Sequence, residues 1–160
     1  MRLHLIAVGR MKAGPERELA ERYAKRLAAS ARPLGMDWRG VTELAEARDT
    51  KAEARRDAEA AAILGKLDSG ARVVALDERG EQPGSEAFAG LVGRFRDDGA
   101  PSLVLAIGGP DGHGAAIRER ADALVAFGRL TWPHQIVRVM ALEQLYRATT
   151  ILAGHPYHRP

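Results

Sequence analysis

The last six residues of the chain, His155 to Pro160, concentrate side chains that can do chemistry. The sequence HPYHRP holds two histidines, a tyrosine, an arginine and two prolines. Histidine moves protons near neutral pH, because its ordinary pKa is about 6.5, and arginine stabilises negative charge on oxygen. Many chain ends carry only unordered polar residues. The tail is therefore either a frayed end or part of an active site, and the rest of the sequence has to decide.

A second candidate is the glycine-rich segment GGPDGHG, which begins at Gly108. It is not a Walker A loop, because no Gly-Lys-Ser/Thr follows. It is not a dinucleotide-binding fingerprint either, because that motif follows the first strand of its domain. The glycines still allow backbone N–H groups to approach a ligand closely. The alternative is a tight turn from a strand into a helix, with Asp111 at its tip.

A third candidate is the segment TWPHQIVRV, at the start of a long apolar helix. Trp132 is suited to stacking on a base or a cofactor ring, or to covering the core. Arg138 follows His134 by four residues, so both share a helix face, and Arg138 is in position to meet a phosphate or a carboxylate. Glu143 and Arg147 have the same spacing, which indicates an ion pair on the helix surface.

Other chemistries are limited by the residues that are missing. The chain has no cysteine, which excludes disulfides, thiolate nucleophiles and zinc–thiolate sites. His134, His155 and His158 lie near one another along the chain, but no carboxylate completes a ligand spacing, so we predict no metal. The G-x-S-x-G signature of a serine hydrolase is absent as well.

Composition favours an ordinary globular protein. The 160 residues, 46% hydrophobic and 28% charged, suit a single domain spanning 1–160. We find no window for a membrane span and no signal peptide, and therefore expect a cytoplasmic protein with no membrane partner. The first 32 residues hold eight Lys or Arg against three acids. This basic end suits a polyanion such as RNA, or else reflects solvated helix faces in an arginine-rich chain.

Strands alternate with helices along the chain. Alternating or continuous apolar runs predict strands, and apolar residues at four-residue spacing predict helices. Thr50 is a candidate N-cap and Gly70 a stop for the second helix, and Ser85 a candidate cap for the third. The predicted strands are 3–8, 35–41, 71–76, 103–107 and 123–127, and the predicted helices are 15–30, 50–70, 86–99, one from about 115, and 136–152.

This alternation implies an α/β fold with a mostly parallel sheet. In such sheets, ligands bind beyond the carboxyl ends of the strands. Three segments occupy that position: the one after Leu76, the one after Ile107, and the loop from Phe127 to Trp132. Their shared position predicts a binding site at this edge.

Four motifs in order carry a resemblance that runs over the whole chain. LDERG follows the third strand, IGGPDG follows the fourth, LTWPHQIVRVMALEQLYRA opens the last helix, and HPYHR comes at the end. Together they resemble the pseudouridine N3-methyltransferases of the ribosomal large subunit, within the SPOUT superfamily. The resemblance implies an α/β sandwich with a mostly parallel sheet and a deep C-terminal trefoil knot. It also implies an obligate homodimer that binds S-adenosyl-L-methionine, with each cofactor pocket completed across the interface.

The resemblance also assigns residues. It implies that the cofactor is gripped mainly by backbone groups of the three segments, at Leu76, Gly108, Phe127, Gly128, Arg129, Leu130, Thr131 and Trp132.

The tail then acquires a candidate role. The N3–H of a uracil-type ring is a weak acid, so its methylation needs deprotonation or strong polarisation. We assign His158 as the candidate base and Arg159 as the electrostatic stabiliser, with Tyr157 stacking on or covering the base. The alternative is that Tyr157 and His158 pack only as a lid.

The expected substrate is large-subunit rRNA within the ribosome. Arg22, Lys25 and Arg26 on the first helix are candidates for contacts to its backbone. One rival interpretation is a non-catalytic ribosome- or RNA-binding protein that keeps the SPOUT fold and the basic surface. A weaker rival is an adenine-nucleotide enzyme.

Overall fold

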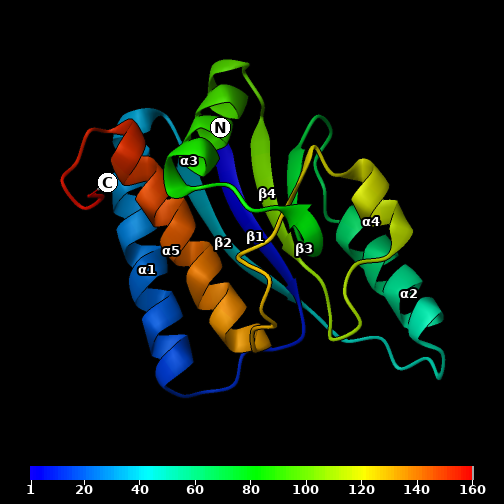
Figure 1. Cartoon of the computed structure of the whole chain (residues 1–160). Coiled ribbons are helices and arrows are strands. Elements are labelled where there is room, and N and C mark those ends of the chain that lie inside the picture. The colour runs from blue at the N-terminus through cyan, green and yellow to red at the C-terminus, as the bar shows by residue number, and fades with distance from the viewer. Residues whose placement is uncertain (160) are drawn as a thin grey trace.

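The strands form one sheet between two layers of helices (Figure 1). The computed structural model describes residues 1–159, and within them the sheet has five strands in the order β2-β1-β4-β3-β5. Every pairing between neighbours is parallel, which confirms the α/β class and the mostly parallel sheet. The strands are β1 (Arg2–Val8), β2 (Asp37–Leu44), β3 (Arg72–Glu81), β4 (Ser102–Ile107) and β5 (Ala123–Val125).

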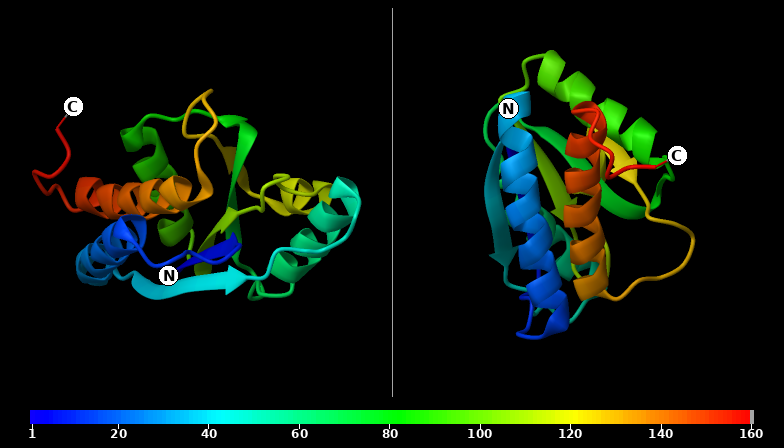
Figure 2. Two further views of the ribbon diagram at one scale, coloured as in Figure 1. Left: turned by 90° about the horizontal axis from the view of Figure 1, so that it is seen from below. Right: turned by 90° about the vertical axis from the view of Figure 1, so that its left-hand side faces the viewer.

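The helices cover both faces of the sheet, as the view from below shows (Figure 2). Helices α1, α3 and α5 pack together on one face, and α2 and α4 cover the other. The helices are α1 (Pro15–Ala31), a 3₁₀ turn η1 (Arg32–Leu34), α2 (Ala52–Leu64), α3 (Ser85–Asp97), α4 (Ala115–Arg120) and α5 (His134–Leu152).

Side chains alternate between the two faces of the sheet and so build two cores. On β1, Leu3 and Leu5 pack under α1, α3 and α5, whereas Ile6 and Val8 pack under α2 and α4. All four are at most 1% exposed. Because both faces of the sheet are covered, the strand sequences are continuous apolar runs, as is typical of a buried parallel sheet.

Three of the predicted helix boundaries were wrong. Helix α2 begins after Lys51, not at Thr50, and it ends at Leu64, where the N–H of the capping residue Gly65 is bonded to the Ala61 carbonyl. Gly70 instead turns the chain before β3, with a positive φ of 74°. At α3, the Ser85 hydroxyl does not cap the helix but bonds to a side chain of α5.

A buried arginine ties the start of α5 to the carboxyl end of β1. Arg138 is 4% exposed, and it donates to the Val8 carbonyl at 3.1 Å and also to the Gly9 carbonyl. It forms an ion pair with Glu43 at the end of β2, with 2.6 Å between Nη1 and Oε1. The expectation that Arg138 meets a phosphate or a carboxylate is met here by a carboxylate within the chain.

Within residues 1–159, no helix combines the length and the apolar character needed to cross a membrane. The trefoil knot implied by the resemblance stays a prediction.

Candidate functional site

The carboxyl ends of β3, β4 and β5 lie side by side. Leu76 on β3 is paired with Ile107 on β4 and with Val125 on β5. Because the strands are parallel, the segments that follow these three residues leave the sheet at the same edge. The register therefore brings together the three segments that the sequence singled out.

Two adjoining cavities open at this edge, and we call them together the strand-end site. One, of about 210 Å³, lies between β3 and the loop that follows β5. The other, of about 380 Å³, lies between β3 and the glycine-rich loop after β4, and both are bordered by Leu76 and Trp132. All eight predicted cofactor positions line one cavity or both: Leu76, Gly108, Phe127, Gly128, Arg129, Leu130, Thr131 and Trp132.

The segment after Leu76 bulges out of the sheet and forms a wall of the site. The pairing of β3 with β5 jumps from Leu76 to Glu81, both opposite Val125, so residues 77–80 are extra. Gly80 makes the bulge possible, because a Cβ there would lie 2.5 Å from the Val125 nitrogen. The bulge places Asp77 beside both cavities.

The glycine-rich loop is a tight turn that is anchored from outside. The Gly112 N–H donates to the Gly109 carbonyl at 2.9 Å, and Gly112 has a φ of +80°. Asp111 at the tip accepts two hydrogen bonds from Arg55 of α2, at 2.7 and 3.1 Å. This guanidinium holds the pKa of Asp111 below its ordinary value, so the anchor stays ionised at neutral pH.

The floor beneath this turn is buried and polar. Glu59 of α2 is 5% exposed and accepts a hydrogen bond from the Ala47 N–H at 3.0 Å, and its carboxylate occupies the space that a side chain at Gly109 would need.

His113 is 3% exposed and lies against Gly108. Burial lowers the pKa of His113, which keeps the ring neutral. The Ala106 carbonyl, 3.3 Å from Nε2, accepts from it, so the proton lies on Nε2.

In the loop after β5, Phe127 packs against the core, whereas the residues from Arg129 to Trp132 are exposed. Leu130 is 74% exposed and Trp132 41% exposed. Gly128 adopts a φ of +125°, a backbone conformation that favours glycine. Recognition of a ligand through the backbone groups of this loop stays a prediction.

The C-terminal tail, from His155 onward, lies elsewhere, against the second half of α5. The Tyr157 hydroxyl donates to Glu143 at 3.0 Å, and its ring lies 4.7 Å from that of Tyr146. The His158 side chain is 18% exposed, and its Nδ1 lies 3.3 Å from an Nη of Arg147. The tail is therefore packed on the helix and does not fray. Arg159 is exposed.

The two candidate regions lie at opposite ends of α5. The strand-end site adjoins the first turn of this helix, and the tail folds back after the last (Figure 2). A helix of 19 residues spans about 28 Å. His158 contacts Arg147, so within one chain about 20 Å of this helix lies between His158 and the start of α5, which follows the loop that contains Trp132.

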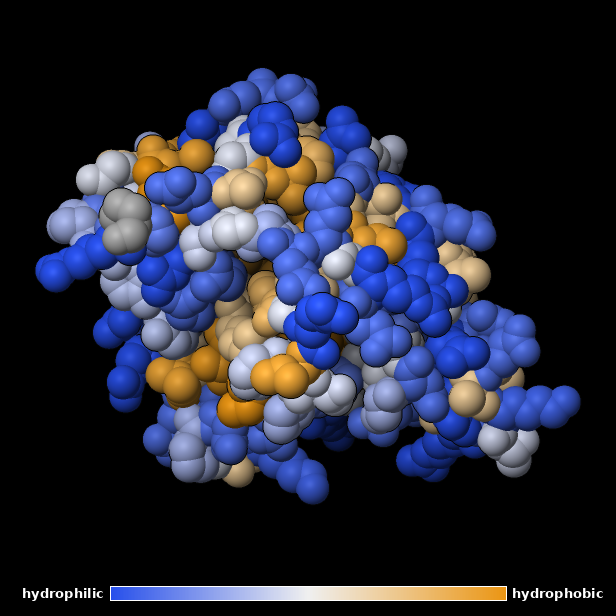
Figure 3. Space-filling view, in the orientation of Figure 1, coloured by the Kyte–Doolittle hydropathy of each residue, from blue (hydrophilic) through white to orange (hydrophobic). Residues whose placement is uncertain are grey.

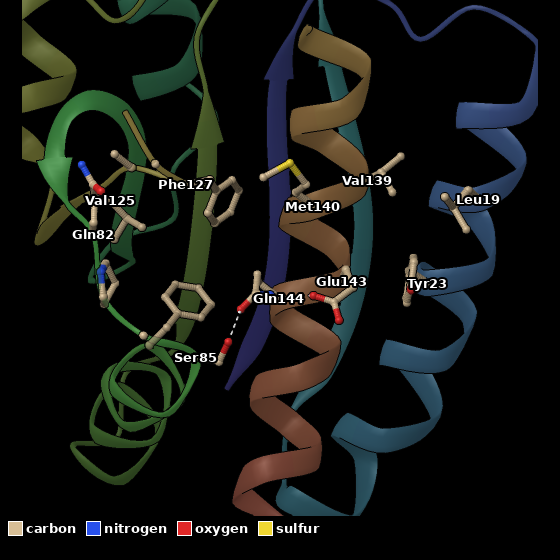
Figure 4. A pocket seen from close by; sticks show the side chains of 15 residues that line it. Leu19, Tyr23, Gln82, Ser85, Val125, Phe127, Val139, Met140, Glu143 and Gln144 are labelled. Carbon is tan, nitrogen blue, oxygen red and sulfur yellow. Dashed lines mark hydrogen bonds between the residues drawn. The ribbon is translucent and has the colours of Figure 1, made fainter. Parts of the chain in front are cut away.

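A further cavity, of about 510 Å³, lies between α1 and α3 above the middle of α5 (Figure 4). It is lined by Leu19, Tyr23, Phe127, Met140 and Glu143, among others. The space-filling view shows apolar residues over the middle of this face, between more hydrophilic surfaces (Figure 3). Two of its lining residues also belong to the regions described above: Phe127 borders the strand-end site, and Glu143, in the middle of α5, holds the tail.

The comparisons with known proteins decide the family. A family model described as a predicted SPOUT methyltransferase matches residues 1–158. The chain belongs to the SPOUT methyltransferase family.

Relatives of this SPOUT methyltransferase match over almost their full length. The chain is 59% identical over 159 residues to a ribosomal RNA large subunit methyltransferase H of Brucella anthropi, covering 99% of each chain. It is 56% identical to the protein of the same name from Brucella abortus strain S19, again covering 99% of each.

A solved structure shows a more distant likeness. The SpoU methyltransferase AviRb from Streptomyces viridochromogenes, in complex with AdoMet, matches with a TM-score of 0.42 at 13% identity. The match covers 96% of this chain and 61% of that one.

Several residues of the strand-end site were not assigned a role from the sequence. Asp77 and Glu78 stand inside the quoted LDERG motif, but the bulge that exposes them depends on pairing with β5. Arg55 and Glu59 lie on α2, far along the chain from the loop they support. Among the described residues, no group of three His, Cys, Asp or Glu side chains is arranged to hold a metal ion.

Proposed function

We propose that this protein methylates N3 of a pseudouridine in large-subunit ribosomal RNA. Its methyl donor is S-adenosylmethionine, its substrate is the assembled ribosome, and its place of action is the cytoplasm. One catalytic domain, 1–160, performs the reaction. The observation that carries the proposal is the convergence of three backbone-lined segments at Leu76, Gly108 and the loop to Trp132. The two relatives named for this rRNA activity support the substrate class.

The strand-end site fits the cofactor. At Gly112 and Gly128 no protein atom lies within 4 Å of the position that a Cβ would take, and the backbone of the loop after β5 is proposed to bind the cofactor. Residues 127–132 are proposed to wrap the adenosine, with Leu76 and Gly108 on the opposite wall. When bound, S-adenosylmethionine supplies an electrophilic methyl group on a sulfonium. The S–CH₃ bond breaks as the N3–CH₃ bond forms, and the sulfur keeps the electron pair of the broken bond.

The tail supplies the polar groups for the other half of the reaction. N3 of the ring has to lose its proton, and it lies between two carbonyl groups. We propose that His158 acts on this N3–H, either by removing the proton or by polarising a flanking carbonyl, and that Arg159 stabilises the negative charge on oxygen. Tyr157 covers or stacks on the ring.

The two halves come together between two copies of the chain. Because His158 is held at Arg147, about 20 Å along α5 from the start of the helix, we propose a homodimer in which each tail serves the partner's cofactor site. The apolar face between α1 and α3 is the proposed contact region, and a C-terminal trefoil knot is proposed to hold the loops. Arg22, Lys25 and Arg26 are exposed on α1 and are proposed to contact rRNA phosphates.

Titration calorimetry with S-adenosylmethionine is the first test. We expect binding, and no binding at high micromolar cofactor would contradict the enzyme and favour a non-catalytic ribosome-binding protein. Tighter binding of ATP than of S-adenosylhomocysteine would indicate an adenine-nucleotide enzyme instead.

Mass spectrometry of rRNA is the second test. In cells that lack this protein, we expect one N3-methylated pseudouridine of the large-subunit rRNA to lose its methyl group. The purified protein should restore the group on ribosomes from those cells. If every modified nucleoside persists in the deletion strain, the proposed substrate is wrong.

A further inference from the structure

Glu143 organises the tail by gathering several donors on one carboxylate. Its Oε1 accepts from Arg147 Nη2 at 2.6 Å, from Arg147 Nε at 3.0 Å and from the Tyr157 hydroxyl at 3.0 Å. The guanidinium also lies over the Tyr157 ring, with Cζ 4.8 Å from the centroid. The side chains of Glu143 and Arg147 are only 15% and 24% exposed. This ion pair is therefore better shielded than an ordinary pair on a helix surface.

Tyr157 and Arg147 both keep their protons at neutral pH. Burial, followed by hydrogen bonds to Tyr23 and Glu143, raises the pKa of Tyr157, so its hydroxyl stays protonated and remains a donor. The hydrogen bond to Glu143 raises the pKa of Arg147. Neither Tyr157 nor Arg147 can take a proton from a substrate at neutral pH.

The remaining arm of Arg147 points at His158. Arg147 Nη1 lies 3.3 Å from His158 Nδ1. A guanidinium donates hydrogen bonds and has no acceptor, so Nδ1 has to present its lone pair. The single proton of a neutral His158 ring then lies on Nε2.

The other charged group that faces His158 comes from α3. Oε1 of Glu86 lies 3.8 Å from Nε2, and the Glu86 side chain is 71% exposed. This distance is too long for a hydrogen bond, so Nε2 is not held by Glu86. Among residues 1–159, Nε2 has no hydrogen-bond partner, so the Nε2–H is the ring group left to meet a substrate, and Arg147 caps the lone pair on Nδ1.

We propose that Arg147 is a positioning residue of this methyltransferase, which holds neutral His158 in the Nε2–H tautomer and makes it a hydrogen-bond donor to the substrate. This inference rests on the proposed function. Of the two roles open to His158, it selects polarisation of a carbonyl beside N3. The N3 proton then leaves to an acceptor other than Nε2, such as water, and Glu143 acts one step further out by holding Arg147.

Nitrogen NMR measures the tautomer without any activity assay. In the full-length protein with ¹⁵N-labelled histidine at pH 8, the two ring nitrogens of His158 are assigned by their loss in H158Q. We expect the wild-type ring to show a protonated Nε2 and an unprotonated Nδ1. In R147Q, the two tautomers should mix. A protonated Nδ1 in the wild type, or an unchanged spectrum in R147Q, would overturn the proposal.

Kinetics on ribosomes separates positioning from structure. R147Q should lower kcat by about 100-fold, the scale of a lost preorganised donor, with the dissociation constant of S-adenosylmethionine unchanged. R147K keeps the charge but not the planar fork, and E143Q weakens the hold on Arg147, so both should give intermediate kcat values. Circular dichroism checks that each variant is folded. If R147Q does not fold, E143Q takes its place in the kinetic test.

The matched control breaks an ion pair of the same spacing elsewhere. Arg17 and Glu21 on α1 are paired at 3.1 Å and are 53% and 59% exposed. R17Q should leave both the His158 tautomer and kcat unchanged. Wild-type protein that neither binds cofactor nor methylates ribosomes would contradict the proposed function, whereas active wild-type protein with fully active R147Q would contradict the role of Arg147 alone.

Discussion

The regions at the two ends of α5 are held in place by different kinds of contact. At its N-terminal end, the strand-end site is shaped by backbone, with glycines at Gly80, Gly108 and Gly112 that permit close approach or a positive φ. At its C-terminal end, the tail is held by side chains, through the Glu143–Arg147 pair and the ring of Tyr157. A backbone site is set by the strand register, whereas the tail depends on a few charged and aromatic groups.

This difference predicts that cofactor binding and chemistry can be damaged independently. A change at the strand-end site has to move strands or loops, so it affects stability and cofactor binding together. A change at the tail leaves the sheet intact. Mutations at the two ends should therefore fall into two experimental classes, and the following predictions test that separation in order of decreasing effect.

Removing the tail is expected to have the largest effect. Deletion of residues 157–160 removes Tyr157, His158 and Arg159, and turnover on ribosomes should fall by about 10²–10⁴-fold. Because the tail is held at Arg147, about 20 Å along α5 from the start of the helix, cofactor affinity should change by less than about twofold. Unchanged turnover would refute the role of the tail. A large loss of cofactor binding in calorimetry would break the separation of the two ends.

Filling the β3 bulge should damage the other end. In Gly80→Ala, the new Cβ meets the backbone of Val125, which cannot move without shifting β5, so the free energy of unfolding should fall by about 3 kcal/mol. Cofactor binding should weaken with it. Urea unfolding and calorimetry measure both quantities.

The control is a glycine that faces open space. Gly90 lies within α3, and a Cβ there would meet only the end of Arg94 at 3.7 Å. Gly90→Ala should therefore be neutral or stabilising, because alanine favours a helix. Equal destabilisation by both substitutions would show that the bulge is not a close-packed feature.

The sequence predicted the scaffold of the strand-end site well. Apolar runs and their alternation with helices located all five strands, and the parallel order then placed the ends after Leu76 and Ile107 at one edge. The bulge was not predicted, because it depends on pairing between β3 and β5. The prediction that Ser85 caps its own helix was wrong for a similar reason, because its hydroxyl is bonded to Gln144 on α5.

Acidity should weaken the fold through the floor of the strand-end site. Burial lowers the pKa of His113, whereas the unfolded chain takes up a proton below about pH 6.5. The stabilisation is therefore complete above pH 6.5 and is lost as the pH falls from there toward the folded pKa. Urea unfolding at pH 8 and pH 5 should show a decrease that is smaller in His113→Gln.

His4 provides the comparison for this measurement. Burial lowers its pKa as well, but it lies on β1 and is bonded to Thr42, away from the strand-end site. In His4→Gln, the loss of stability that His113 causes at low pH should remain, and cofactor binding should be unchanged. An unaltered pH dependence in His113→Gln would contradict a neutral buried ring.

The smallest effect is expected at an exposed side chain of the cofactor loop. Leu130 is 74% exposed, so Leu130→Ser should change the free energy of unfolding by less than about 0.5 kcal/mol and leave cofactor affinity nearly unchanged. Gly128→Ala, in the same loop, forces a side chain onto a φ of +125° and should weaken cofactor binding clearly. A stronger effect of Leu130→Ser than of Gly128→Ala in calorimetry would contradict recognition through the backbone.

The tail shows where sequence reasoning reaches its limit. The spacing of Glu143 and Arg147 predicted their ion pair, and residue types alone marked Tyr157 and His158 as reactive. The direction of the tail, back along α5, depends on the rings of Tyr146 and Tyr157 meeting after the helix has ended. No pattern within six residues encodes that contact, so the tautomer of His158 was not predictable either.

The buried Arg138 has a consequence for how the chain is made. Its contact with Val8 joins residues 130 positions apart, and α5 also packs along α1. Domains usually fold from the N-terminus as synthesis proceeds, but here β1 cannot gain its final partners until the last helix has been translated. The core under α1, α3 and α5 therefore closes only after α5 has left the ribosome that makes it, whereas the core under α2 and α4 contains no residue of α5.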